Sequence, residues 1–210
     1  MRQSPLAPDW HWAAGVWHGA NMSDAFLSAA TAILGQRGLS RDSEVMNPWL
    51  TDWRGRYSGR AIALASPAST EEVAAVVKLC VQHRVPIVPQ GGNSGMSGGA
   101  TPDESGDSLL LSLRRMDTIR HWDEDARQVV CDAGVVLQSL HQAAAGRGLR
   151  FPLTLGGKGS ATIGGLISTN AGGTQVLRHG TMRAQVRGLE AVLPDGTVLD
   201  TLAALKKDNR

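Results

Sequence analysis

The chain has 210 residues, of which 42% are hydrophobic and 19% are charged, with a formal net charge of +2 at pH 7. This is ordinary globular composition with enough apolar residues for a sizeable core. The small net charge argues against nucleic acid as a partner, and no apolar run approaches the ~20 residues that span a bilayer.

Two cysteines, Cys80 and Cys131, lie far apart on apolar segments, so we expect reduced core residues rather than a disulfide or a metal site. Free thiols favour a reducing compartment, and we predict a cytoplasmic protein. The histidines have no acidic or cysteine partners at metal-binding spacing, so no metal is expected.

The first segment, residues 1–21, holds three tryptophans among Pro, His and Gly without the apolar stretch of a signal peptide. We expect a non-structural extension, with Met22 as an alternative start of translation. An amphipathic pattern from Met22 then predicts a helix that ends near Gly35 or Gly38. Residues 22–58 are predicted to comprise this helix and an approach to the first strand.

The aromatic and basic run from Trp49 to Tyr57 has no periodicity, so we expect an ordered connection. Its arginines have two alternatives, solvent or a bound anion, and solvent is favoured because charged side chains are mostly exposed. A strand over residues 61–64 follows. Ser69 and Glu72 form a capping box, which predicts a helix with one apolar face: Val73, Val76, Val77, Cys80 and Val81.

A second apolar run, residues 85–88, completes a strand-helix-strand unit, which should be parallel. It leads into residues 89–100, which read PQGGNSGMSGGA, and then into a third apolar run at 109–111. Glycines let main-chain N–H groups converge on an anion, so this loop is predicted to cradle a phosphate. The alternative is a purely structural loop, since Gly/Ser composition also suits linkers.

Beyond residue 113 the predicted strands are shorter. Residues 119–122 and 128–131 flank a charged turn and suggest an antiparallel hairpin, and residues 135–146 suggest a helix. Residues 188–193 and 197–199 flank Pro-Asp-Gly, a strong turn signal. These elements imply a second α+β lobe.

A second glycine-dense region lies between Pro152 and Gly180, with eight glycines from 156 to 180. This density disfavours helices and strands, yet the region holds apolar residues suited to burial. We expect ordered loops pressed against a flat ligand, with a mobile surface loop as the alternative.

These segments together resemble a known family. VPQGGNSGMSGGA, FPLTLGGKGSATIGGLISTNAGG, GLEAVLPDGTVLD and LKKDN occur in this order between about Trp49 and Asn209. The chain is similar to the FAD-binding domain of the vanillyl-alcohol oxidase/PCMH superfamily, in the branch of D-2-hydroxyglutarate and D-lactate dehydrogenases. The resemblance implies an α+β fold with a small parallel βαβ lobe and a mixed or antiparallel lobe with flanking helices. It places this domain at residues 59–210, incomplete at its carboxyl end.

The resemblance also implies a cofactor, non-covalently bound FAD, because Asn93 and Ser94 stand where some relatives carry a flavin-linked histidine. The FAD pyrophosphate is expected on the first glycine loop, at Gly91, Gly92, Asn93, Ser94, Gly95, Met96 and Gly99. The isoalloxazine and ribityl groups are expected at Pro152, Gly156, Ser160, Ile163, Gly164, Gly165 and Asn170.

The family chemistry removes the α-hydride of a D-2-hydroxy acid to flavin N5. Relatives continue after LKKDN with closing strands and a substrate domain that carries the metal-ligand histidines. The sequence ends at Arg210, so we assign no catalytic residue. His179 stands where this branch is expected to have tyrosine, and a packed or solvent-facing role is favoured for it. An inactive fragment that binds FAD weakly or not at all, and one subunit of a split enzyme, remain alternatives.

Overall fold

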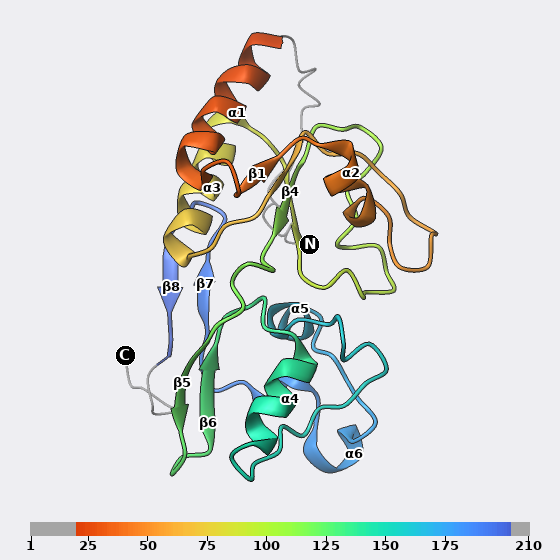
Figure 1. Cartoon of the computed structure of the whole chain (residues 1–210), viewed down its shortest axis with the longest axis vertical. Helices are drawn as coiled ribbons and strands as arrows, with labels where there is room; N and C mark the ends of the chain where they lie inside the picture. The colour runs from red at the N-terminus through yellow and green to blue at the C-terminus, as the bar shows by residue number, and fades with distance from the viewer. Residues whose placement is uncertain (1–19, 203–210) are drawn as a thin grey trace, which may run out of the picture.

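The computed structural model describes residues 20–202, which form two lobes, one above the other in Figure 1. The predicted extension, residues 1–21, lies almost wholly outside the described residues. The first helix begins at Ala20, two residues before the predicted start at Met22. None of the described helices is both long and apolar enough to cross a membrane.

The first lobe is a four-stranded sheet with helices on both faces. The strand order is β1-β2-β4-β3, in which β1 is antiparallel to β2 and the other pairs are parallel. Its elements are α1 (Ala20–Leu34), β1 (Leu39–Ser40), α2 (Ser43–Met46), the 3₁₀ helix η1 (Asn47–Trp49), β2 (Ala63–Ala65), α3 (Thr70–His83), β3 (Ile87–Gln90) and β4 (Leu109–Ser112).

The two faces of this sheet follow from the period of two along each strand. On β2 and β4, Ala63 and Leu109 point into a core made with α1 and α3, where Phe26 is 1% exposed. Leu64 and Leu110 point the other way, toward Met46 of α2. Because both faces are covered, β2 is apolar throughout and β4 is apolar up to Ser112, which is typical of parallel sheets.

Helix α3 begins as the capping box predicts. The Ser69 side chain accepts a hydrogen bond from the Glu72 main-chain N–H at 3.2 Å, and the Glu72 carboxylate accepts one from the Ala68 N–H at 2.7 Å. The predicted apolar face is buried except for Val81, which is 55% exposed, so its inclusion was wrong. Val81 lies at the end of the helix, where the apolar face has already turned past the sheet.

The unit β2-α3-β3 is parallel as expected, but its two strands are not neighbours. Strand β4 lies between them, with Leu64 beside Leu110 and Val88 also beside Leu110. The glycine loop therefore connects the edge strand β3 to the central strand β4.

The second lobe is built from a hairpin and short helices around a separate core. Strands β5 and β6 are antiparallel, as predicted, and Leu137, Leu140 and Leu153 are each no more than 1% exposed. The remaining elements are β5 (Ile119–Asp123), β6 (Gln128–Cys131), α4 (Leu137–Ala145), α5 (Ile163–Ser168), α6 (Val176–His179), α7 (Met182–Gln185), β7 (Glu190–Val192) and β8 (Val198–Asp200).

The hairpin β7–β8 returns to the first lobe. Val192 packs against the core under α3, and the tight turn at Gly196 has a φ of 79° and lies against Lys78 and Ala74 of that helix. The α+β class with a parallel and an antiparallel part is thus confirmed. The expectation that the glycines disfavour helices in residues 152–180 was wrong, because α5 and α6 form there. Packing of Ile163 and Leu166 into the second core stabilises α5 despite the low helix propensity of its glycines.

Candidate flavin site

The glycine loop, residues 91–100, leaves the carboxyl end of β3 and is held at both ends by one buried side chain. Gln90 is 1% exposed, and its Nε2 donates to the carbonyl oxygen of Trp49 at 3.0 Å and to that of Ala100 at 2.7 Å. Two further contacts fix the loop: Asn93 Nδ2 donates to the Thr51 carbonyl at 2.8 Å, and Gly98 lies against the Tyr57 ring. The loop is thus anchored by side chains.

The main-chain N–H groups of this loop are left free. Among residues 20–202, none of the N–H groups from Gly91 to Ala100 donates a hydrogen bond to a protein atom. Asn93 adopts a left-handed conformation with a φ of 51°, which changes the direction of the main chain within the loop. Unpaired main-chain amides in such a turn form a concave donor surface that suits an anion. This is the strongest physical support for a phosphate cradle.

The two glycine-rich regions touch. A Cβ built on Gly92 would overlap the Ser160 carbonyl, and one built on Gly91 would overlap the Thr162 hydroxyl, so only glycine permits this approach. The first loop belongs to one lobe and Ser160 to the other. Gly91 and Gly92 therefore form a contact between the lobes, and the absence of a side chain allows their α-carbons to approach Thr162 and Ser160.

Other glycines face open space. Within residues 20–202, no protein atom lies within 4 Å of a Cβ position on Gly95, Gly99 or Gly156, and none of these three has a positive φ. Ser94 lies between the two regions, with its Cβ 3.7 Å from the Cβ position of Gly157. Gly95, Gly99 and Gly156 are thus open to solvent, and Met96, which follows Gly95, is 54% exposed.

In the second glycine region, α5 carries several expected site residues in different roles. The Ile163 side chain is 6% exposed within the second core, and Gly164 lies against Ala133. Asn170 has a φ of 47°, and its Oδ1 accepts from the Arg183 N–H at 3.0 Å, which anchors α7. Ile163, Gly164 and Asn170 therefore position the main chain, while exposed Ser160 and half-buried Pro152 lie at the surface.

A buried hydroxyl without a partner lies at the junction of these regions. Thr162 is 1% exposed, and among residues 20–202 its Oγ1 has no hydrogen-bond partner, although it lies 3.3 Å from the Cβ position of Gly165 and beside Gly91. Buried hydroxyls normally have a partner, so this hydroxyl beside the glycine loop is consistent with a ligand or an ordered water at the junction. Free amides, open glycines and this hydroxyl fit a diphosphate-bearing cofactor.

Titratable side chains near the cradle serve the backbone. Asp52 is 4% exposed, and its carboxylate accepts hydrogen bonds from the N–H groups of Tyr57, Arg56 and Arg54, of which the Tyr57 bond is the main cause of its lowered pKa. The turn over residues 52–57 that Asp52 holds lies next to the glycine loop, because Asn93 Nδ2 donates to the Thr51 carbonyl. Within residues 20–202, no group of three His, Cys, Asp or Glu side chains is placed to hold a metal ion.

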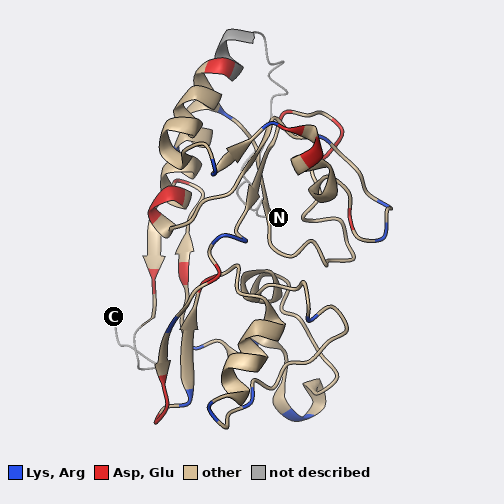
Figure 2. Cartoon of the chain, viewed as in Figure 1, with Lys and Arg blue, Asp and Glu red and all other residues tan. Residues whose placement is uncertain are grey.

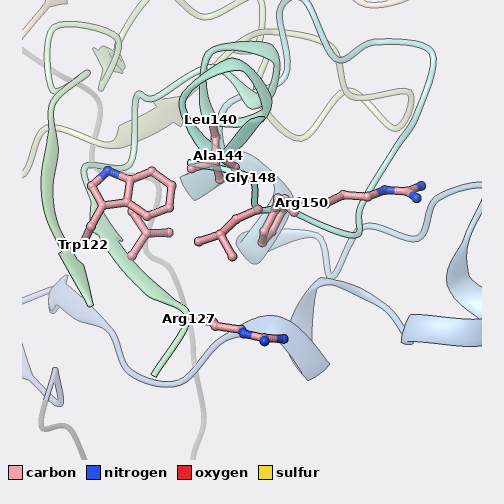
Figure 3. Close-up of a pocket in the computed structure, with 9 residues that line it drawn as sticks. Trp122, Arg127, Leu140, Ala144, Gly148 and Arg150 are labelled. Atoms are coloured by element: carbon pink, nitrogen blue, oxygen red, sulfur yellow. The ribbon is translucent and has the colours of Figure 1, made fainter. Parts of the chain in front are cut away.

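A separate pocket of about 380 Å³ opens in the second lobe, between the β5–β6 hairpin and α4 (Figure 3). Trp122, Leu140 and Ala144 form its apolar wall, and Arg127 and Arg150 extend along its rim. None of the residues that line this pocket is among those expected to bind FAD. The cradle is an open surface between glycine-rich segments, whereas this pocket is a groove in the packing of the second lobe.

Sequence reasoning missed three residues of the site: Gln90, Thr162 and Asp52. Asp52 had a readable signal, because Asp followed three residues later by Gly is typical of a turn held by the Asp side chain. Gln90 and Thr162 had none, since their roles depend on carbonyls and glycines far away in the sequence. His179 lies in α6 beside a shallow groove lined by Arg150 and Gln175, outside the cradle.

Comparison with known proteins identifies the family. The model of the FAD binding domain family matches residues 61–202, a span that contains both glycine-rich regions. The chain belongs to the FAD binding domain family. FAD is accordingly the cofactor that the free amides and open glycines of this domain suit.

Named relatives of this FAD binding domain include D-2-hydroxyglutarate dehydrogenases. The mitochondrial D-2-hydroxyglutarate dehydrogenase of Bos taurus is 42% identical over 188 residues, which cover 90% of this chain and 34% of the bovine protein. The Arabidopsis thaliana protein of the same name is 40% identical over 177 residues, or 84% of this chain and 31% of its own length. The chain thus spans about a third of the length of these relatives.

A solved structure of alkyldihydroxyacetonephosphate synthase has the same fold. It superposes with a TM-score of 0.76 and 22% identity, covering 87% of this chain and 39% of that one. The FAD-binding PCMH-type fold expected from the sequence is confirmed. The individual cofactor contacts, from Gly91 to Asn170, stay predictions.

Proposed function

We propose that this chain is the FAD-binding portion of a flavin-dependent oxidoreductase that acts on a D-2-hydroxy acid of the D-2-hydroxyglutarate or D-lactate type. The observation that carries the proposal is the free main chain from Gly91 to Ala100, which faces the second glycine-rich region across the junction of the lobes. The substrate class rests on the names of the bovine and Arabidopsis relatives.

In this proposal the loop amides around Asn93 and Gly95 hold the FAD pyrophosphate. Convergent N–H donors satisfy phosphate oxygens without a fixed cation. The Thr162 hydroxyl and the open face at Gly156 then border the ribityl and isoalloxazine groups. FAD is held without a covalent bond, because Asn93 and Ser94 occupy the part of the loop where a histidine link would form.

When bound, FAD supplies a two-electron acceptor for the α-hydride of the substrate. This chain contributes binding and orientation: Gln90 fixes the loop ends, and Asp52 holds the adjacent wall. We assign no general base to the chain. The D-2-hydroxy acid becomes a partner only when the remaining two thirds of the relatives' length is supplied, and the electron acceptor is unassigned. A cytoplasmic location remains our prediction, while both relatives are named mitochondrial.

The test is a titration of the purified chain with FAD, followed by quenching of flavin fluorescence and by the visible absorbance of the washed protein. We expect saturable binding that survives gel filtration and is lost on acid denaturation, which releases FAD with its native spectrum when no covalent bond exists. A chain that stays colourless and leaves flavin fluorescence unchanged would refute the proposal.

A second candidate is a chain that binds FAD weakly or not at all by itself, or that serves as one subunit of a split enzyme. It is favoured by a single observation, the coverage of about a third of the relatives' length. Anaerobic addition of D-2-hydroxyglutarate or D-lactate to the FAD-loaded chain separates the two. Loss of the visible flavin band supports an oxidoreductase complete enough to act, and persistence of the band supports the subunit.

A further inference from the structure

Arg120 connects the two lobes through a chain of charged side chains. From β5, its Nε donates to Asp132 Oδ1 at 2.5 Å, and its Nη1 and Nη2 donate to the two carboxylate oxygens of Glu190 at 3.1 and 3.2 Å. Glu190 also accepts a hydrogen bond from the Thr70 hydroxyl at the start of α3. One guanidinium is thus bound to two carboxylates at once.

The ends of this chain belong to different cores. Asp132 follows β6, and the β5–β6 hairpin packs with Ile119 and Cys131 in the second lobe. Glu190 lies on β7, whose hairpin is docked on α3 of the first lobe through Val192 and Gly196. Figure 2, viewed as Figure 1, shows the β7–β8 hairpin between α3 of the first lobe and the β5–β6 hairpin of the second. The bonds therefore run across the boundary between lobes.

The geometry requires arginine. A planar guanidinium binds one carboxylate with two parallel hydrogen bonds and still has Nε for another, which an ammonium group does not. The side chains are shielded, with Asp132 10%, Glu190 23% and Arg120 36% exposed. Consistent with this, the hydrogen bond from Arg120 is the main cause of the lowered pKa of Glu190.

The glycine-rich regions meet across the same boundary. Gly92 comes from the first lobe and Ser160 from the second, so the angle between lobes sets the distance between the loop amides and the surface at Gly156. We propose that Arg120 is a positioning residue for FAD, which fixes the lobes at the spacing that one cofactor molecule spans. This inference rests on the proposed placement of FAD across both regions.

The experiment compares two ligands in one variant. On the proposed placement of FAD, ADP carries the diphosphate that the loop of the first lobe would bind, whereas FAD would also reach the second lobe. For Arg120→Met, we expect the Kd for FAD to rise at least about tenfold, equivalent to about 1.4 kcal/mol, with the Kd for ADP unchanged. Arg120→Lys should behave like Arg120→Met, because lysine cannot bind both carboxylates in this geometry.

The matched control is Arg147→Met. Arg147 also lies in the second lobe, stacks on Trp122 at 4.5 Å from the ring centroid, and is 40% exposed, but it bridges no lobes. Its loss should leave both Kd values unchanged. If Arg120→Met does not fold, Glu190→Gln removes the same charge pair with a smaller change in shape and should give the same selective loss of FAD.

Three results would overturn the inference. One is wild-type FAD affinity in the foldable variants at Arg120 or Glu190. Another is an equal loss of FAD and ADP affinity, which would mean general damage to the fold. The third is a wild-type chain that binds no FAD, which would refute the proposed function as well and is recognised before any variant is made.

Discussion

The contact between the two glycine-rich regions makes a sharp prediction for Gly92→Ala. The φ of Gly92 is not positive, so alanine adds no backbone strain there. The substitution acts only through steric overlap. The new methyl group would overlap the Ser160 carbonyl and approach the Ala161 Cα to 3.2 Å. Since the obstacle is main chain rather than a flexible side chain, the two segments must move apart.

The size of the effect follows from the cost of overpacking, which is about 1–3 kcal/mol. For a chain of this length, 1 kcal/mol shifts the melting temperature by about 2–4 °C, so Gly92→Ala should lower it by roughly 2–12 °C. Separation of the segments also moves the loop amides away from Ser160. We therefore expect the Kd for FAD to rise at least about tenfold.

Gly95→Ala is the matched control, three residues along the same loop. No atom lies within 4 Å of its Cβ position, and its φ is not positive. Alanine should leave the free energy of unfolding equal or raise it by up to about 1 kcal/mol, because it restricts the unfolded chain. Its methyl group projects toward the open face, so FAD affinity should fall without loss of stability.

Differential scanning fluorimetry of the FAD-free chain and an FAD titration measure both quantities. Wild-type stability and FAD affinity in Gly92→Ala would show that the loop and Ser160 are not in contact in solution. A large loss of stability in Gly95→Ala would show that the face beside the cradle is closed rather than open.

Three further predictions follow from buried groups. Burial raises the pKa of the Cys80 thiol to about 12, so Cys80 should resist alkylation at pH 8 in the native chain and react on denaturation; rapid native labelling, read by mass spectrometry, would contradict its burial. Gln90→Met should lower the unfolding free energy by about 2 kcal/mol in urea titrations, since two hydrogen bonds of about 1 kcal/mol each are lost; an unchanged midpoint would mean that the loop ends are held otherwise. The lowered pKa of Asp52 means that its carboxylate stabilises the fold fully above the pKa of an unfolded aspartate, and that this stabilisation is lost as pH falls through the folded pKa. Asp52→Asn should therefore lower the melting temperature at pH 7 and much less at pH 3. A difference in melting temperature that does not change with pH would contradict this.

Local patterns in the sequence predicted several elements, and the resemblance to a known family predicted the cofactor. The capping box at Ser69, the hairpin at residues 119–131 and the Pro-Asp-Gly turn before β8 depend on residues a few positions apart, so their patterns were readable. The combination of glycine-rich motifs was sufficient to predict FAD and the PCMH-type fold. The helix α5 was missed because packing of Ile163 overrides the low helix propensity of its glycines.

The way these elements meet depends on the tertiary structure. It placed β4 between β2 and β3, brought Gly92 against Ser160, and joined Arg120 to Glu190 across the lobes. Each of these contacts joins residues far apart in the sequence. The physical reason is that such pairings depend on the packing of whole elements against a shared core, so no local pattern around either partner records the other.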